Sequence, residues 1–221
     1  PILFLACTNA SIPFYLFSKA GLDLNAGTMS VLNGTTPLFS FLIATFWLKL
    51  SSNWVQFLGI LIGMIGLIVF VGYESLEFSL IAIILCLTAS FLYAFSSNFI
   101  FKTKEIDATY LASITLLFAT FIDFPFTFLE DGLHFNHDTP VLLSVFLLGF
   151  ACTGLAYMGY VVLIKRVGPV KASTVVLIVP VSGMLWANIF LNEAITLTML
   201  VGSFLIITGV GLVNFFKDEI S

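Results

Sequence analysis

Long apolar stretches separated by short polar connections dominate the chain. None of the stretches shows the apolar/polar alternation of a transmembrane barrel strand, and each is about twice as long as one. A helix needs about 20 mostly apolar residues to cross the hydrocarbon core of a bilayer. The pattern therefore predicts eight transmembrane helices, over residues 2–18, 28–48, 54–72, 78–101, 108–129, 141–164, 172–191 and 197–216.

Composition points to the same class of protein. Sixty per cent of the 221 residues are apolar and 9% are charged, whereas a soluble domain carries about 25% charged residues. This balance excludes an ordinary soluble enzyme, a nucleic-acid-binding protein and a disordered tail. The predicted fold class is an all-α, polytopic membrane helix bundle.

Basic residues set the expected orientation, because they collect in cytoplasmic loops. The first, third, fifth and seventh connections lie on one side of the membrane, and together they carry a single basic residue, Lys19. The second, fourth and sixth connections and the C-terminal tail lie on the other side. They carry seven basic residues, which are Lys49, Lys102, Lys104, Lys165, Arg166, Lys171 and Lys217. We therefore expect a protein of a bacterial inner (cytoplasmic) membrane, with both ends of this chain in the cytoplasm.

An internal repeat is visible at an offset of 143 residues. Segments 28–72 and 172–216 match with Pro37 on Pro180, Gly59 on Gly202 and Gly66 on Gly209. The first segment is predicted to enter the membrane from outside and the second from inside, so the two copies are inverted. Inverted repeats are the architecture of many secondary transporters.

The repeat also predicts a division of the chain. Residues 1–73 hold the last three helices of a first copy, and residues 74–221 hold a second copy of five helices. Three helices against five predict two further helices before Pro1. The eight visible helices would then belong to a ten-helix protein.

Several short motifs lie in the matching register. They are Asn25-Ala26-Gly27-Thr28, Thr36-Pro37-Leu38-Phe39, Lys171-Ala172-Ser173, Val179-Pro180-Val181 and Leu191-Asn192-Glu193. With these motifs the chain resembles the EamA branch of the drug/metabolite transporter superfamily over nearly its whole length. The resemblance implies an inverted-repeat carrier with a central cavity, often exporting amino acids, metabolites or toxic compounds. The chain departs from the family pattern in one respect. The family often has a Glu after the proline-containing helix of both copies, and here Glu193 has that place in the second copy whereas Leu50 occupies the equivalent position of the first. A symmetric role for this Glu is therefore not implied.

Prolines mark candidate cavity positions, because a proline inside a helix frees the carbonyl four residues earlier. Pro13 frees the carbonyl of Asn9, and Pro37 frees that of Asn33. Each Asn-x-x-x-Pro pattern puts a free carbonyl and a carboxamide on one helix face. Such a face lines a water-filled cavity, or else it is a packing kink satisfied by neighbouring helices.

A candidate substrate cavity follows from these positions and from polar aromatic residues that suit a ring or an apolar side chain. We hypothesise that Asn33 faces Ser182 and Trp186 across it, with ordinary core packing as the alternative for each residue. The predicted set is Asn9, Asn33, Pro37, Tyr93, Tyr157, Pro180, Ser182 and Trp186.

Other groups carry weaker expectations. Asp123 is the only acid within a predicted helix, and it is either a proton-coupling carboxylate or a residue at a helix end. The glycines predict close helix packing or a homodimer face. A solvated loop is favoured over a metal site for three outer-loop residues, His134, His137 and Asp138. We expect no metal, no cofactor and no disulfide.

The predicted function is secondary transport. No Lys or Arg lies deep in a predicted helix, which favours neutral or zwitterionic solutes such as amino acids, exported from the cell. The expected partners are this small-molecule substrate and the lipid bilayer. We expect no nucleic-acid partner and no enzymatic activity. The alternatives are a nucleotide-sugar or phosphate carrier of the same superfamily, a membrane-embedded enzyme and a sensor.

Overall fold

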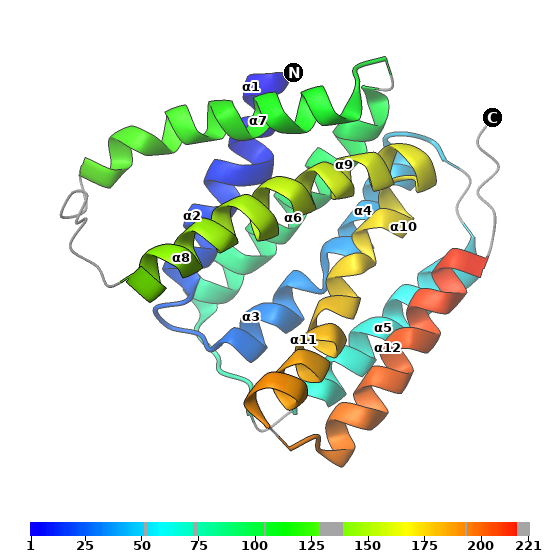
Figure 1. The fold of residues 1–221 in the computed structure, drawn as a ribbon. Helices are drawn as coiled ribbons and strands as arrows, with labels where there is room; N and C mark the ends of the chain where they lie inside the picture. Colours follow the sequence, from blue (N-terminus) through cyan, green and yellow to red (C-terminus); the bar gives the residue numbers. More distant parts are fainter. Residues whose placement is uncertain (51–52, 73–74, 104, 129–138, 193, 216–221) are drawn as a thin grey trace.

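The computed structural model describes residues 1–50, 53–72, 75–103, 105–128, 139–192 and 194–215. Eight helical segments in it are long and apolar enough to cross a membrane (Figure 1). They confirm the eight predicted helices. Their bounds are Ile2–Ala20, Ala26–Phe46, Trp54–Val71, Leu80–Lys102, Ala108–Phe126, Thr139–Val167, Pro169–Phe190 and Leu197–Phe215.

Four of these segments are interrupted. The first and sixth contain π-helical turns, giving α1 (Ile2–Ala6), η1 (Cys7–Ser11) and α2 (Ile12–Ala20), and later α8 (Thr139–Leu147), η4 (Leu148–Leu155) and α9 (Ala156–Val167). The second and seventh are broken into shorter helices, namely α3 (Ala26–Asn33) with α4 (Thr36–Phe46), and α10 (Pro169–Ser173) with α11 (Val175–Leu191).

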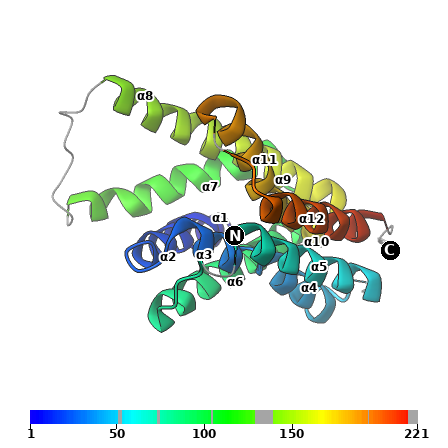
Figure 2. The ribbon, with the colours of Figure 1, turned by 90° about the horizontal axis from the view of Figure 1, so that it is seen from below.

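The remaining segments are more regular. They are α5 (Trp54–Val71), α6 (Leu80–Lys102), α7 (Ala108–Asp123) with the 3₁₀ turn η3 (Phe124–Phe128), and α12 (Leu197–Phe215). In both views α5 and α12 lie side by side, and α11 packs against both (Figures 1 and 2).

The 143-residue offset extends to the backbone conformation. Adding it to η1 gives 150–154, which lies inside the second π-helical segment, η4. The same offset relates the first residue of α5 to that of α12. Lys49 and Asn192, which follow the equivalent helices α4 and α11, are also 143 apart, and both have a φ of 54°. Since left-handed backbone is uncommon for residues other than glycine, this shared φ supports the repeat.

Glycines bring α5 and α12 into close contact. A Cβ atom at Gly59 would lie 2.7 Å from the carbonyl oxygen of Gly209, and one at Gly66 would lie 2.9 Å from that of Gly202. Position 59 is the repeat equivalent of 202, and 66 is that of 209, so each contact is the counterpart of the other. The two equivalent helices therefore run antiparallel about a local two-fold axis. These glycines are used inside the molecule and do not form a dimer face.

The connections join at two ends of the bundle. At one end Lys165 Nζ donates hydrogen bonds to the carbonyl oxygens of Thr103, at 2.8 Å, and Ile106. At the other end Asn25 Nδ2 donates to the carbonyl oxygen of Ser75 at 2.8 Å. These contacts join the connections that follow α2 and α5 at one end, and the end of α9 with the connection that follows α6 at the other, as the predicted orientation requires.

Alanine at position 209 should lower stability, because its methyl group would lie 2.5 Å from backbone atoms of Gly59 and Gly63. Such overpacking costs about 1–3 kcal/mol. Gly211 is the matched control on the same helix, since a Cβ there meets no atom within 4 Å. Thermal unfolding in detergent should show a lower midpoint for Gly209→Ala and little change for Gly211→Ala. Equal midpoints would contradict the close contact.

Accessibility labelling should separate the two ends. Basic residues collect at the end of the bundle that holds Thr103 and Lys165, and such residues face the cytoplasm. Single cysteines replacing Leu50, Thr103 and Val167 should therefore react only from the cytoplasm, and one replacing Ser75 only from outside. Phe135, which lies outside the described residues, is expected to label with Ser75. Labelling of positions 75 and 103 from the same side would refute the inverted arrangement.

Candidate functional site

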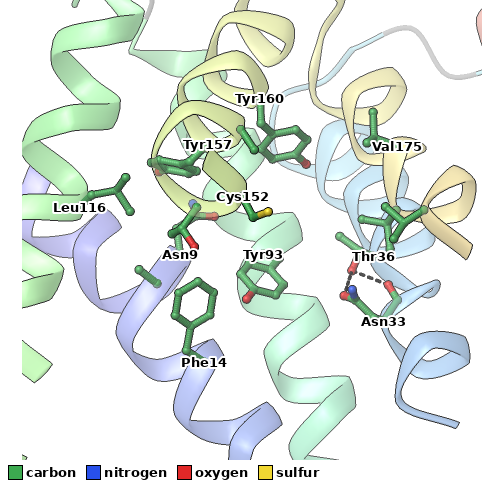
Figure 3. Close-up of a pocket in the computed structure, with 15 residues that line it drawn as sticks. Asn9, Phe14, Asn33, Thr36, Tyr93, Leu116, Cys152, Tyr157, Tyr160 and Val175 are labelled. Atoms are coloured by element: carbon green, nitrogen blue, oxygen red, sulfur yellow. Dashed lines mark hydrogen bonds between the residues drawn. The ribbon is translucent and has the colours of Figure 1, made fainter. Parts of the chain in front are cut away.

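A cavity of about 360 Å³ lies among helices from both halves of the chain (Figure 3). Every side chain that lines it is uncharged. The lining residues are Asn9, Ala10, Phe14, Asn33, Thr36, Tyr93, Leu116, Cys152, Thr153, Ala156, Tyr157, Tyr160, Val175, Val176 and Val179.

The cavity lies on the local two-fold axis. Ten of its 15 lining residues form five pairs at the 143-residue offset. The pairs are Asn9 with Cys152, Ala10 with Thr153, Phe14 with Tyr157, Asn33 with Val176, and Thr36 with Val179. Because equivalent positions face the same space, both halves share the cavity.

The break between α3 and α4 places amide groups on the cavity wall. Pro37 has no N–H to offer the carbonyl oxygen of Asn33. The hydroxyl of Thr36 instead donates to this oxygen at 2.7 Å and lies 3.2 Å from Asn33 Oδ1. Among the described residues, none accepts a hydrogen bond from Asn33 Nδ2. The carboxamide N–H groups are therefore available to a solute or to water.

Besides the Asn33 carboxamide, a cluster of polar side chains lies where η1 meets α7 and α9. Tyr157 Oη and Thr115 Oγ1 are buried without a hydrogen-bond partner among the described residues. Asn9 and Thr115 are the polar neighbours of the Tyr157 hydroxyl. Buried polar atoms without partners are costly, so this group suits a bound water or a polar atom of a solute.

Aromatic rings form another part of the wall. Ser97 has one hydroxyl proton, which it donates to the carbonyl oxygen of Tyr93 at 2.9 Å. Tyr160 Oη is 3.2 Å from Ser97 Oγ and must therefore be the donor of that pair. The ring of Tyr93 stacks on Phe17, with 6.1 Å between the ring centroids. These contacts hold two tyrosine rings in place beside the cavity.

The structure brings part of the predicted set to this cavity. Four of the eight predicted residues line it, and these are Asn9, Asn33, Tyr93 and Tyr157. Pro37 is buried next to Thr36, and Pro180 follows Val179 inside α11 without lining the space. Whether the cavity binds a substrate stays a prediction.

Ser182 and Trp186 do not reach the cavity. Ser182 is exposed and donates a hydrogen bond to the carbonyl oxygen of Val179, and Trp186 is 60% exposed. Both continue the helix face that carries Val175 and Val179. At a rise of about 1.5 Å per residue, Trp186 lies roughly 10 Å beyond Val179 along α11. Whether a solute contacts Ser182 or Trp186 stays a prediction.

Other lining residues were missed. Cys152, Val176 and Val179 could have been found by applying the repeat offset to Asn9, Asn33 and Thr36. Thr115, which is buried beside the Tyr157 hydroxyl and does not line the cavity, had no signal in the sequence, because its position depends on how α7 packs. The described residues include no group of three His, Cys, Asp or Glu that could hold a metal ion. His134, His137 and Asp138 lie outside the described residues.

Comparison with known sequences identifies the family. Residues 1–72 and 80–215 match the EamA-like transporter family. The chain belongs to this family. Its membership confirms the resemblance seen in the motifs, and it makes this chain part of a membrane transporter.

Relatives of this EamA-family chain carry transporter names. An uncharacterized transporter of Archaeoglobus fulgidus is 24% identical over 208 residues, covering 90% of this chain and 72% of its own length. YoaV, an uncharacterized transporter of Bacillus subtilis, is 26% identical, covering 85% and 66%. An uncharacterized transporter of Buchnera aphidicola is 28% identical, covering 99% and 76%.

A solved structure shares the fold. A crystal structure of another protein superposes on this EamA-family chain with a TM-score of 0.83 at 14% identity. The superposition covers 97% of this chain and 76% of the other. At this identity the likeness concerns the fold alone.

Cys152 provides a native probe of the cavity. A charged methanethiosulfonate reagent should modify Cys152, which lines the cavity, but not Cys86, which is fully buried. Mass spectrometry of the intact and digested protein measures both sites, and Cys152→Ala is the control. Reaction of Cys152 with a lipid-soluble maleimide but not with the charged reagent would place it against lipid instead.

Proposed function

We propose that this EamA-family chain forms the substrate pathway of a secondary transporter that exports small neutral or zwitterionic metabolites, such as amino acids with an apolar or aromatic side chain. The observation that carries the proposal is the uncharged cavity shared by two inverted halves. A carrier of phosphate or of a nucleotide sugar is expected to use a cation for recognition. The lining therefore supports the first solute class over the second.

The lining of the cavity offers polar and apolar positions to such a solute. The first half supplies Asn9, Asn33 and Thr36, and the second half supplies the hydroxyl groups of Tyr93, Thr153, Tyr157 and Tyr160. Amide and hydroxyl groups fix the polar end of a ligand, whereas apolar and aromatic groups cover its body. A solute with one polar end and one apolar end would thus find partners for both ends in this cavity.

Movement would follow from the inverted repeat. In such carriers one repeat rocks against the other around a site near the midplane. We propose residues 1–73 and 74–221 as the parts of the two copies, and a bacterial inner membrane with cytoplasmic chain ends as the setting. The breaks at α3/α4 and α10/α11 border the cavity, where discontinuous helices commonly bind the solute.

Replacing Asn33 by Leu tests the cavity directly. The substitution removes the free carboxamide donors, and an apolar side chain is tolerated in a membrane helix. Uptake of labelled amino acids into proteoliposomes should fall to background with unchanged protein yield. Asn214→Leu on α12 is the matched control, since Asn214 bonds only to the carbonyl oxygen of Val210 in its own helix. Wild-type flux from Asn33→Leu would contradict the proposal.

Pro37→Ala tests the free carbonyl. Alanine at this position supplies an N–H that can bond to the carbonyl oxygen of Asn33, in competition with the Thr36 hydroxyl. We expect a change in the transport rate of several-fold, with a smaller effect on thermal stability. An unchanged rate together with a lowered unfolding temperature would assign Pro37 to packing alone.

A further inference from the structure

A second cavity, of about 640 Å³, adjoins the central one. Phe14 lines both, so its ring separates them. The other lining residues come from η1, α2, the end of α7 and η3. They are Ser11, Ile12, Tyr15, Ser18, Ile122, Asp123 and Phe126.

The fold creates this cavity where two helices diverge. Ala6, Ala10 and Ala119 form one buried cluster, in which α7 packs on α1 and η1, with Ile122 at its edge. Alanine side chains permit close approach between helices. Beyond this contact α7 ends at Asp123 and the chain continues as the 3₁₀ turn η3. The space beyond the alanines is the second cavity.

Two polar groups of this cavity have no polar partner among the described residues. Ser11 is 7% exposed, and its Oγ is one of them. The other is the carboxylate of Asp123, which is half-buried at the end of α7. Ser11, Tyr15 and Ser18 lie four and three residues apart, so they share one face of the helix. Burying part of an unpaired carboxylate is costly, so Asp123 suits a cationic ligand.

The electrostatics of this cavity favour a cation. Asp123 is the last residue of α7, where the helix dipole adds partial negative charge. Lys19 Nζ lies 5.6 Å from the centroid of the Tyr15 ring, so this ring already has a cation over it. The Asp123 carboxylate is therefore the lining group that would pair with a second cation. A volume of about 640 Å³ fits an organic molecule rather than a bare ion.

We propose that Asp123 and Ser11 form a second subsite that binds the protonated amino group of an amine-bearing solute. The Asp123 carboxylate pairs with the ammonium group, and Ser11 Oγ accepts one of its hydrogen bonds. The solute passes between this subsite and the central cavity beside Phe14. The inference rests on the proposed transport function and narrows its substrates to solutes with a free amine.

Binding to the purified full chain tests the subsite. The two probes are 2-phenylethylamine and its N-acetyl derivative, which share a ring and differ in the charged amine. Asp123→Asn keeps the shape of the side chain and should weaken binding of the amine by roughly ten- to a hundred-fold, leaving the N-acetyl derivative unchanged. Ser11→Ala should weaken binding of the amine by a smaller factor. Asp23→Asn, at an exposed loop position, is the control and should alter neither affinity.

Several results would overturn the subsite. They are equal effects of Asp123→Asn on both probes, no effect on either, or no binding of the amine to the wild-type protein. Loss of proton-driven flux of both solutes with unchanged binding would make Asp123 a proton-coupling carboxylate instead. Elution profiles and unfolding temperatures verify that the variants fold.

The same measurements separate the subsite from the proposed function. Asp123-dependent binding without flux into proteoliposomes would retain the subsite and reject transport by this chain. Flux that depends on Asn33 but not on Asp123 would retain transport and reject the subsite.

Discussion

The close contact between α5 and α12 is the constraint on which the rest of the structure depends. In lipid, helices associate through packing rather than through the hydrophobic effect, and small residues permit their close approach. Gly59, Gly66, Gly202 and Gly209 leave no room for a side chain between the two backbones. Because the two helices are repeat equivalents that pack antiparallel, their contact defines the local two-fold axis and brings the other helices of each half around one cavity.

The scaffold is symmetric, whereas its chemistry is not. Equivalent positions line the cavity in pairs, yet Asn9 and Asn33 of one half face Cys152 and Val176 of the other. Once the backbone is duplicated and inverted, side chains on the two walls are free to differ. At two other pairs the second half is the more polar, since Thr153 and Tyr157 are the equivalents of Ala10 and Phe14. Each half therefore offers both polar and apolar positions to an amphipathic solute, and the carboxylate of Asp123 lies outside this pair-related lining.

Much of the fold could be predicted because its signals are local. Hydropathy gave the eight helices, and the prolines pointed to Asn9 and Asn33. The extent of the cavity along α11 depends on how whole helices cross, so the sequence could not show that its lining ends before Ser182 and Trp186. The hydrogen bond from Lys165 to Thr103 joins residues 62 apart, and the cavity beside Asp123 arises where α7 leaves α2. No sequence pattern specifies either of these.

Pulsed EPR distances between spin labels test most directly whether the halves move about the α5–α12 axis. Labels at Leu22 and Phe190 span the outer ends of the two halves, labels at Lys49 and Arg166 span the inner ends, and labels at Leu58 and Ile207 report on α5 and α12. On addition of a transported amino acid, the outer and inner distances should change in opposite directions and the α5–α12 distance should stay constant. A change in the α5–α12 distance with the other two fixed would contradict rocking about this axis.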